Sequence, residues 1–375
     1  MKRSEFFGEG LFQWQISSSD YKKLWQERRY DENKYWGEFP RNYTEQALPS
    51  WAIGPFKKYE GNPVFAPSEQ GWDRGHISGG VHNGSILFRN GKFYYIYRGE
   101  SPAPCVRSDK VSGDIDVIFD YICDIGIAVS DDGVHFTRIG EGLFRKGKNE
   151  KYSFEDVCCV EKDGRYYLFC NRWYWQDPVN PAECGVFLAT STDLIHWKEQ
   201  GLVFPQAARI HRNACVVQDP QNCAVKIDGK YLMYMNDGLL AYSDDLLHWN
   251  SREIELSWPG GEGCFALADY NAAQPDNILL FTGGHHCGHF YAIGEVLFHK
   301  DNPSKPLDWL KRPALYSSDV PYEQGFSCKD SNRMVSAWQD TVFFTGLTRH
   351  GGKWLCYYGG SEYYTCLAEA EANNN

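Results

Sequence analysis

Short polar segments that occur once in the chain, beside stretches rich in β-forming residues, hold the side chains best suited to catalysis. Acidic groups that enter one site from different segments could cleave a glycosidic bond. One carboxyl group would protonate the leaving oxygen, while another would activate water or attack the sugar. These segments are residues 82–85, 97–100, 153–157, 212–215, 218–222, 260–264 and 283–286.

A repeated pattern of strands and turns must position these segments. Asp-Gly and Asn-Gly pairs at several of the copies supply the positive φ that tight hairpins require. A repeat of this length is typical of a β-propeller blade, so the sequence predicts an all-β fold with five blades. One loop from each blade would then reach a central funnel that could hold a sugar ring. The five copies are residues 91–97, 163–169, 228–234, 276–281 and 352–358.

The repeats favour one catalytic domain, a five-bladed β-propeller over residues 51–375. Residues 1–50 form an N-terminal extension that is partly helical, because the polar residues 17–20 could cap a helix over residues 21–28. The extension could pack on the outside of the propeller or join two subunits into a homo-oligomer. The first blade is predicted over residues 80–108, and the second is predicted to begin at Asp124.

Composition narrows the partners and the compartment. The net charge of -11 argues against nucleic acid, because phosphate binding needs a basic surface. No apolar run reaches about 18 residues, so no membrane-spanning segment is expected. The 13 cysteines include no C-x-x-C pair, which favours reduced thiols in a cytoplasmic protein. Aromatic residues, 16% of the chain, suit both strands and stacking on sugars, so an oligosaccharide is the expected partner.

Acidic and imidazole groups inside the repeats are expected to be structural. His135, His196 and His248 occupy the same place in three related segments, and equivalence between blades indicates architecture. Aspartates in the hairpin turns are assigned to turn formation for the same reason. They are Asp131, Asp132, Asp163, Asp228 and Asp244.

Three parts of the chain resemble glycoside hydrolase family 130. Residues 283–306 look like the fourth-blade signature of that family, with residues 313–315 and 322–323 following at a suitable distance. Residues 357–370 resemble its ending, a Tyr-Tyr-Gly followed by an acid and then Leu-Ala. Glu155-Asp156, ahead of an Asp-Gly-Arg-Tyr-Tyr turn, is similar to its catalytic motif. The resemblance spans about residues 54 to 370.

The resemblance implies a five-bladed propeller that acts on β-mannosides by phosphorolysis with inversion or, in some members, by hydrolysis. Asp156 would be the general acid and would protonate the glycosidic oxygen through a hydroxyl of the bound mannose. Arg98 matches a sugar-binding position, although an arginine–carboxylate pair could instead lock the funnel wall. Glu362 stands where the family has an Asp that holds sugar hydroxyls. The substrate-binding positions expected here are Asn83, Arg98, Glu155, Glu323 and Glu362.

Departures from the family pattern favour hydrolysis. Phosphorolysis needs cationic donors around phosphate, yet residues 222–225 hold no arginine and Glu262 stands where a lysine is expected. We therefore predict an inverting, exo-acting glycoside hydrolase. Glu262 is the first candidate for the general base, and Asp219 is the second.

His285 and His286 are expected to contact sugar hydroxyls, because they lie in a glycine-rich loop without a helical zinc motif. No metal and no cofactor are predicted. Three alternatives remain open: a phosphorylase of β-mannosides, a furanosidase resembling the family 43, 32 or 117 propellers, and a carbohydrate-binding propeller without catalysis. Asn83 stands where a furanosidase would need an Asp, which weakens the second alternative.

Overall fold

The computed structural model describes most of the chain beyond the N-terminal extension. The extension and its expected helix, up to residue 47, lie outside the described residues. Side chains are not described for residues 107–111, 115–119, 175, 181–182, 237, 284–286 and 290. The described ranges are 48–75, 79–100, 107–111, 115–119, 123–144, 152–175, 181–205, 211–254, 262–286, 290–310, 313–336, 338 and 340–372.

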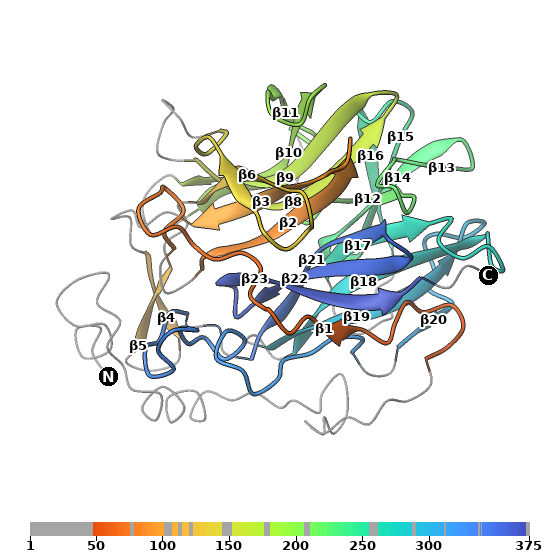
Figure 1. Cartoon of the computed structure of the whole chain (residues 1–375). Helices are drawn as coiled ribbons and strands as arrows, with labels where there is room; N and C mark the ends of the chain where they lie inside the picture. Colours follow the sequence, from red (N-terminus) through yellow and green to blue (C-terminus); the bar gives the residue numbers. More distant parts are fainter. Residues whose placement is uncertain are drawn as a thin grey trace.

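Four-stranded antiparallel blades follow one another along the chain, which confirms the all-β, five-bladed propeller (Figure 1). The first contains β2 (Val81–Arg89), β3 (Lys92–Glu100), β6 (Cys123–Ser130) and β7 (Thr137–Ile139). The second contains β8 (Tyr152–Lys162), β9 (Arg165–Trp175), β10 (Pro181–Ser191) and β11 (Lys198–Leu202). The third contains β12 (Cys215–Gln218), β14 (Lys230–Met235), β15 (Leu239–Ser243) and β16 (Trp249–Glu253).

The fourth blade contains β17 (Glu262–Ala268), β18 (Asn277–His286), β19 (Phe290–His299) and β20 (Asp308–Trp309). The fifth contains β21 (Val342–His350), β22 (Lys353–Gly360), β23 (Tyr364–Glu371) and the N-terminal β1 (Lys57–Lys58). Pairing of β1 with β23 closes the ring, since the first described strand covers the edge of the last blade. The smaller elements are β13 (Lys226–Ile227), the 3-10 turn η1 (Asn236–Gly238) and the hairpin β4 (Arg107–Val111)–β5 (Ile115–Phe119).

The first blade extends further along the chain than predicted. Asp124 lies in β6, the third strand of the first blade, rather than at the start of the second. The difference arises because the hairpin β4–β5 is inserted between β3 and β6, so the aromatic burst and the rest of its blade are far apart in sequence. Each burst marks the second strand of a blade, not its beginning.

The three related Ser-x-Asp-x-x-His segments, which begin at Ser130, Ser191 and Ser243, are turns. In the first of them Asp132 accepts hydrogen bonds from the amides of Val134 and His135, at 2.9 Å each, and lies 2.7 Å from His135 Nδ1. The hydrogen bonds from His135 hold the pKa of the Asp132 carboxyl well below its usual range. Asp193 and Asp245 repeat this pattern. The three histidine side chains are 85–87% exposed, so their contacts are local.

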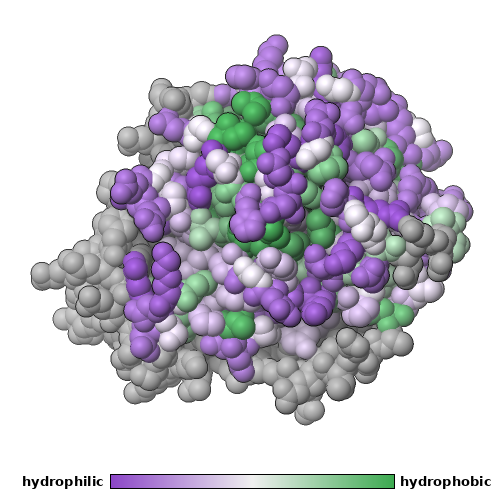
Figure 2. All heavy atoms as spheres, viewed as in Figure 1, coloured by the Kyte–Doolittle hydropathy of each residue, from purple (hydrophilic) through white to green (hydrophobic). Residues whose placement is uncertain are grey.

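Packing between neighbouring blades forms the core, and the innermost strands β2, β8, β12, β17 and β21 each adjoin the next around the ring. Figure 2 shows a mostly hydrophilic face with some apolar residues near its middle. The described cysteines are all free thiols, mostly buried, as predicted. Within the described residues, no helix has the length and hydropathy needed to cross a membrane.

A buried glutamate anchors the segment that leads into β1. Ile53 N donates a hydrogen bond to Glu295 Oε2 at 3.0 Å, and Tyr270 donates to the Trp51 carbonyl at 2.8 Å. Glu295 is 1% exposed, and its second oxygen has no hydrogen-bond partner. Burial raises the pKa of Glu295 to about 8, although the Ile53 amide opposes the shift.

We predict that Glu295→Gln changes the pH dependence of stability. The folded protein holds a proton on Glu295 up to about pH 8, whereas the unfolded chain releases it near its usual pKa of about 4.3. The stability of the wild type therefore falls between these two values, and the amide variant lacks this decline. Urea unfolding should give equal stabilities near pH 4, with the variant more stable at pH 9 by on the order of 5 kcal/mol. Glu371→Gln, at an exposed position, is the control, and a parallel pH profile for all three proteins would contradict the prediction.

Candidate active site

The innermost strands of four blades lose their regular pairing at the same level. The register shifts between His82 and Ser85 in β2, between Glu155 and Cys158 in β8, between Gly263 and Phe265 in β17, and between Phe344 and Gly346 in β21. A bulge re-aims the side chain that it contains. The residues turned inward are Asn83, Asp156, Cys264 and Thr345, joined by Asn213 just before β12.

Three of these residues adopt a left-handed backbone conformation. The φ angles are 44° at Asn83, 54° at Asp156 and 55° at Asn213. Asn and Asp tolerate this region better than other residues with a side chain. The residue types on the first three blades therefore suit both the backbone and the polar chemistry of the site.

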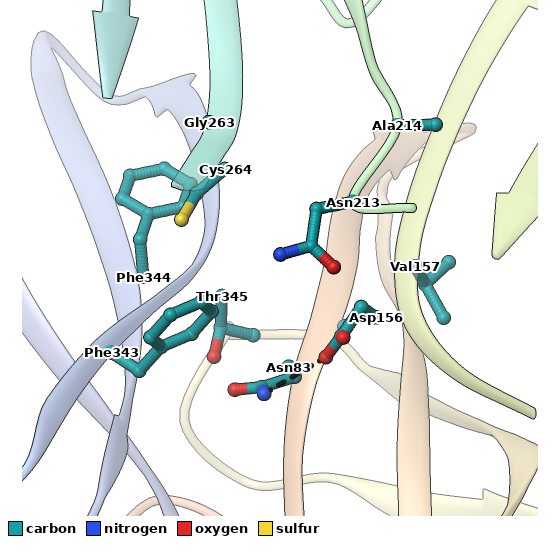
Figure 3. Close-up of a pocket in the computed structure, with 11 residues that line it drawn as sticks. Asn83, Asp156, Val157, Asn213, Ala214, Gly263, Cys264, Phe343, Phe344 and Thr345 are labelled. Carbon is teal, nitrogen blue, oxygen red and sulfur yellow. Dashed lines mark hydrogen bonds between the residues drawn. The ribbon is translucent and has the colours of Figure 1, made fainter. Parts of the chain in front are cut away.

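A pocket opens between these strands (Figure 3). Asn83, Asp156 and Asn213 form its polar wall, and Phe343 and Phe344 lie opposite in the view. The complete lining comprises Asn83, Gly84, Asp156, Val157, Asn213, Ala214, Gly263, Cys264, Phe343, Phe344 and Thr345.

The Asp156 carboxylate is held by amide groups on both oxygens. Asn83 Nδ2 donates to Oδ1 at 3.0 Å, and Asn171 Nδ2 donates to Oδ2 at 2.8 Å. Asn171 is itself fixed by Asn213, which accepts at 2.9 Å from the same nitrogen and donates its backbone amide to the Asn171 oxygen at 2.8 Å. The Asp156 side chain remains 21% exposed, so it can reach a ligand in the pocket.

Arg98 lies behind this carboxylate and joins several acids. Its Nε donates to Glu100 at 2.6 Å, and its Nη1 lies 3.1 Å from Glu155 and 3.7 Å from Asp156. Glu100 is fully buried and Glu155 is 5% exposed. Glu155 also accepts a hydrogen bond from Trp173 Nε1. The Arg98 donors are therefore engaged mainly by protein carboxylates.

Two acids of the site bind protons more tightly than usual. Burial raises the pKa of Glu155 to about 7, with Arg98 opposing the shift and Asp156 adding to it. Burial likewise raises the pKa of Glu362, on the fifth blade, to about 8. Arg98 lowers that value, while Asp156, Glu100 and Glu155 raise it. Acids from three blades thus interact around one guanidinium group.

Glu262 lies beside the pocket on the fourth blade and faces the third. Its Oε1 is 3.3 Å from Nη2 of Arg212, and the two side chains are 15% and 35% exposed. Tyr291 interacts electrostatically with Glu262, Glu362, Arg212 and Asp156, so these groups surround one region. Glu262 is thus placed where a group acting on a bound ligand could stand.

The structure corrects two predicted site residues. Asp219 follows the far end of β12, and its Oδ1 accepts the backbone amides of Gln221 and Cys223 in a tight turn. It lies six residues beyond Asn213, at the opposite end of β12, which is up to roughly 20 Å along an extended chain because a strand advances about 3.3 Å per residue. Glu323 has no exposed surface, and its oxygens accept hydrogen bonds from Lys58, Ser318 and Tyr358. It fixes the loop before β21 and is unavailable to a substrate.

The remaining predicted residues are only partly described. His285 and His286 end β18 as backbone positions, and their side chains lie outside the described residues. No group of His, Cys, Asp or Glu among the described residues could hold a metal ion.

Sequence reasoning did not select several residues that build the site. Asn171, Asn213, Cys264 and Thr345 were absent from the predicted set, as was the buried Glu100. Glu100, Asn213 and Cys264 could have been found, because they lie in the once-occurring polar segments 97–100, 212–215 and 260–264. Asn171 and Thr345 carry no such signal, since each lies inside a strand-forming run.

Comparisons with known proteins identify relatives of this fold. Residues 119–262 match glycoside hydrolase family 130, described as β-1,4-mannooligosaccharide phosphorylase. A 1,2-β-oligomannan phosphorylase of Thermoanaerobacter sp. (strain X514) is 27% identical over 340 residues, covering 82% of this chain and 94% of the relative.

Two solved structures share the fold at lower identity. One belongs to the glycoside hydrolases of family 130 that target β-1,2-mannosidic linkages in Candida mannan; it is 23% identical, has a TM-score of 0.67 and covers 87% of this chain and 96% of that chain. The β-1,2-mannobiose phosphorylase of Listeria innocua is 19% identical, has a TM-score of 0.60 and covers 84% of this chain and 97% of that chain.

Proposed function

We propose that this chain, as a five-bladed β-propeller of the glycoside hydrolase family 130 type, cleaves β-1,2-linked mannosides by phosphorolysis with inversion. The observation that carries the proposal is Asp156, a partly exposed carboxylate held by two amides at the wall of the central pocket. The choice of phosphate rests on the Thermoanaerobacter relative, which is a phosphorylase. Phosphorolysis therefore replaces hydrolysis, the reaction that the sequence alone favoured, as the first proposal.

In the proposed reaction Asp156 supplies a proton to the glycosidic oxygen, directly or through a hydroxyl of the bound mannose. The bond between the anomeric carbon and that oxygen breaks as a phosphate oxygen attacks the opposite face of the ring. The products are mannose 1-phosphate and the shortened sugar. Arg212 is the guanidinium group best placed to bind phosphate, because its side chain is 35% exposed and it meets one carboxylate.

Hydrolysis is a second candidate, favoured by the charge around the pocket. Among the described side chains of this cluster, Glu100, Glu155, Asp156, Glu262 and Glu362 are acidic, whereas the guanidinium groups are those of Arg98 and Arg212. The raised pKa values of Glu155 and Glu362 leave these two groups partly or mostly neutral near pH 7, so the repulsion that opposes a phosphate dianion comes from the acids that are ionised. In this reaction Glu262 would take the proton from the attacking water.

Product analysis separates the two reactions. The protein is incubated with β-1,2-mannobiose, with and without inorganic phosphate, and mannose and mannose 1-phosphate are quantified. Phosphorolysis requires that mannose 1-phosphate forms and that cleavage stops when phosphate is removed. Release of free mannose at the same rate without phosphate would instead establish hydrolysis.

Two variants test the roles given to the pair on the third and fourth blades. Under phosphorolysis, Arg212→Met should raise the KM for phosphate by about tenfold while the KM for the mannoside changes little, because a charged hydrogen bond is lost. Under hydrolysis, Glu262→Gln should abolish turnover, since water would lose its base. If the protein cleaves neither mannobiose nor longer β-mannosides, the remaining interpretation is a carbohydrate-binding propeller. If it cleaves arabinofuranosides instead, it is a furanosidase.

A further inference from the structure

Two buried oxygen atoms on the pocket wall have no hydrogen-bond partner in the described part of the chain. They are Asn83 Oδ1 and Thr345 Oγ1, and each residue is 5% exposed. Both residues line the central pocket, on the first and fifth blades, and in Figure 3 their oxygens point toward the same part of it. Buried polar atoms are nearly always satisfied, so this pair indicates a place where a ligand supplies the missing partner.

The orientation of the Asn83 amide is fixed by its other end. Asn83 Nδ2 donates to Asp156 Oδ1 at 3.0 Å, which directs Oδ1 away from the acid and into the pocket. Gly359 lies beside this oxygen, and a β-carbon there would be 3.6 Å from it. That β-carbon would also lie 3.3 Å from the β-carbon of His82, so this side of Asn83 is closely packed and a ligand must approach from the pocket.

The chemistry of the two oxygens defines the group that fits them. An amide oxygen only accepts hydrogen bonds, whereas a threonine hydroxyl can accept or donate one. An ionised carboxylate would have no proton for Asn83. The neighbouring wall is formed by Phe343, Phe344 and Cys264, which offer nothing to a charged group. A neutral O–H group satisfies both atoms.

We propose that Thr345, with Asn83, binds one hydroxyl of the mannosyl unit that is transferred, and that Thr345 thereby determines specificity. The proposal rests on the proposed function, because the ligand is the sugar of that reaction. Asn83 contacts both this hydroxyl and Asp156, so recognition of the hydroxyl also orients the acid. Thr345 is a positioning residue for that contact and takes no part in proton transfer.

The test compares Thr345→Val, which removes the hydroxyl at nearly constant volume, with Thr345→Ser, which keeps it. Values of kcat/KM are measured for β-1,2-mannobiose and for analogues that each lack one hydroxyl of the non-reducing mannose. Thr345→Val should lower kcat/KM for the parent sugar about tenfold, the usual effect of one lost hydrogen bond. The analogue that lacks the hydroxyl bound by Thr345 should already be a poor substrate of the wild type, so Thr345→Val should not lower its kcat/KM further. Thr345→Ser should recover most of the activity on the parent sugar.

Thr282→Val is the matched control, because Thr282 also has a buried hydroxyl without a hydrogen-bond partner but does not line the pocket. It should leave kcat/KM unchanged, and thermal unfolding should show that all three variants fold. If Thr345→Val lowers kcat/KM equally for every analogue, the two oxygens bind a water molecule and the proposal is overturned. Wild-type kinetics of the Thr345→Val variant would also overturn it. A wild type that does not cleave mannobiose at all would instead refute the proposed function.

Discussion

Asp156→Asn should lower kcat on β-1,2-mannobiose by about 10³-fold, the contribution typical of a general acid, while substrate binding is kept. The substitution preserves shape and removes the proton donor. Loss of kcat is measured by mannose 1-phosphate release, and binding by calorimetry. If the variant keeps full activity, the assignment of Asp156 as the acid is wrong.

The amide network around residue 156 can accommodate this variant. Asn171 cannot turn over, because its nitrogen also bonds to Asn213. Asn83 can turn over, since its oxygen has no hydrogen-bond partner among the residues that the structure describes. An amide nitrogen at residue 156 would then donate to the Asn83 oxygen, and we expect the fold to persist.

A substrate with a better leaving group gives a stricter test of the acid. An aryl β-mannoside needs little protonation, so Asp156→Asn should impair its cleavage far less than that of mannobiose. Equal losses on both substrates would point to a structural effect instead. Asp163→Asn is the control, because Asp163 lies in an exposed hairpin turn with φ of 53° that Asn also tolerates.

Arg98→Met should lower the free energy of unfolding by roughly 3–5 kcal/mol, because removing one partner of a buried ion pair leaves charge uncompensated. Arg98 is the group that joins Glu100, Glu155 and Asp156. Arg98→Lys keeps the positive charge but lacks the separate N–H groups with which the guanidinium contacts two carboxylates at once. Its stability should lie between those of the wild type and the methionine variant, as measured by urea unfolding.

A double variant distinguishes lost packing from orphaned charge. Adding Glu100→Gln to Arg98→Met removes the most deeply buried acid of the cluster. The double variant should be more stable than Arg98→Met alone, since the charge that caused the loss is gone. An additive further loss of stability would show that the arginine acts by filling space and not by neutralising the acids.

The sequence by itself determined the propeller and selected Asp156 as the candidate acid. Strand and turn patterns are local, because hairpin geometry depends on a few neighbouring residues, so five aromatic bursts and their Asp-Gly turns were sufficient to predict the blades. Asp156 could be selected because it belongs to a motif that occurs once. The blade boundary at Asp124 was mistaken because the insertion β4–β5 separates strands that pair only in space.

Only the tertiary structure decided which polar residues share the pocket. Asn83, Asp156 and Thr345 come from three blades, and bulges at one level of the ring turn them inward. Asp219 and Glu323 look equally suitable in sequence, yet one caps a turn and the other is enclosed by Lys58, Ser318 and Tyr358. The carboxylate group is chemically the same at each of these positions. Its role depends on which groups surround it, and those groups are brought together by closure of the ring.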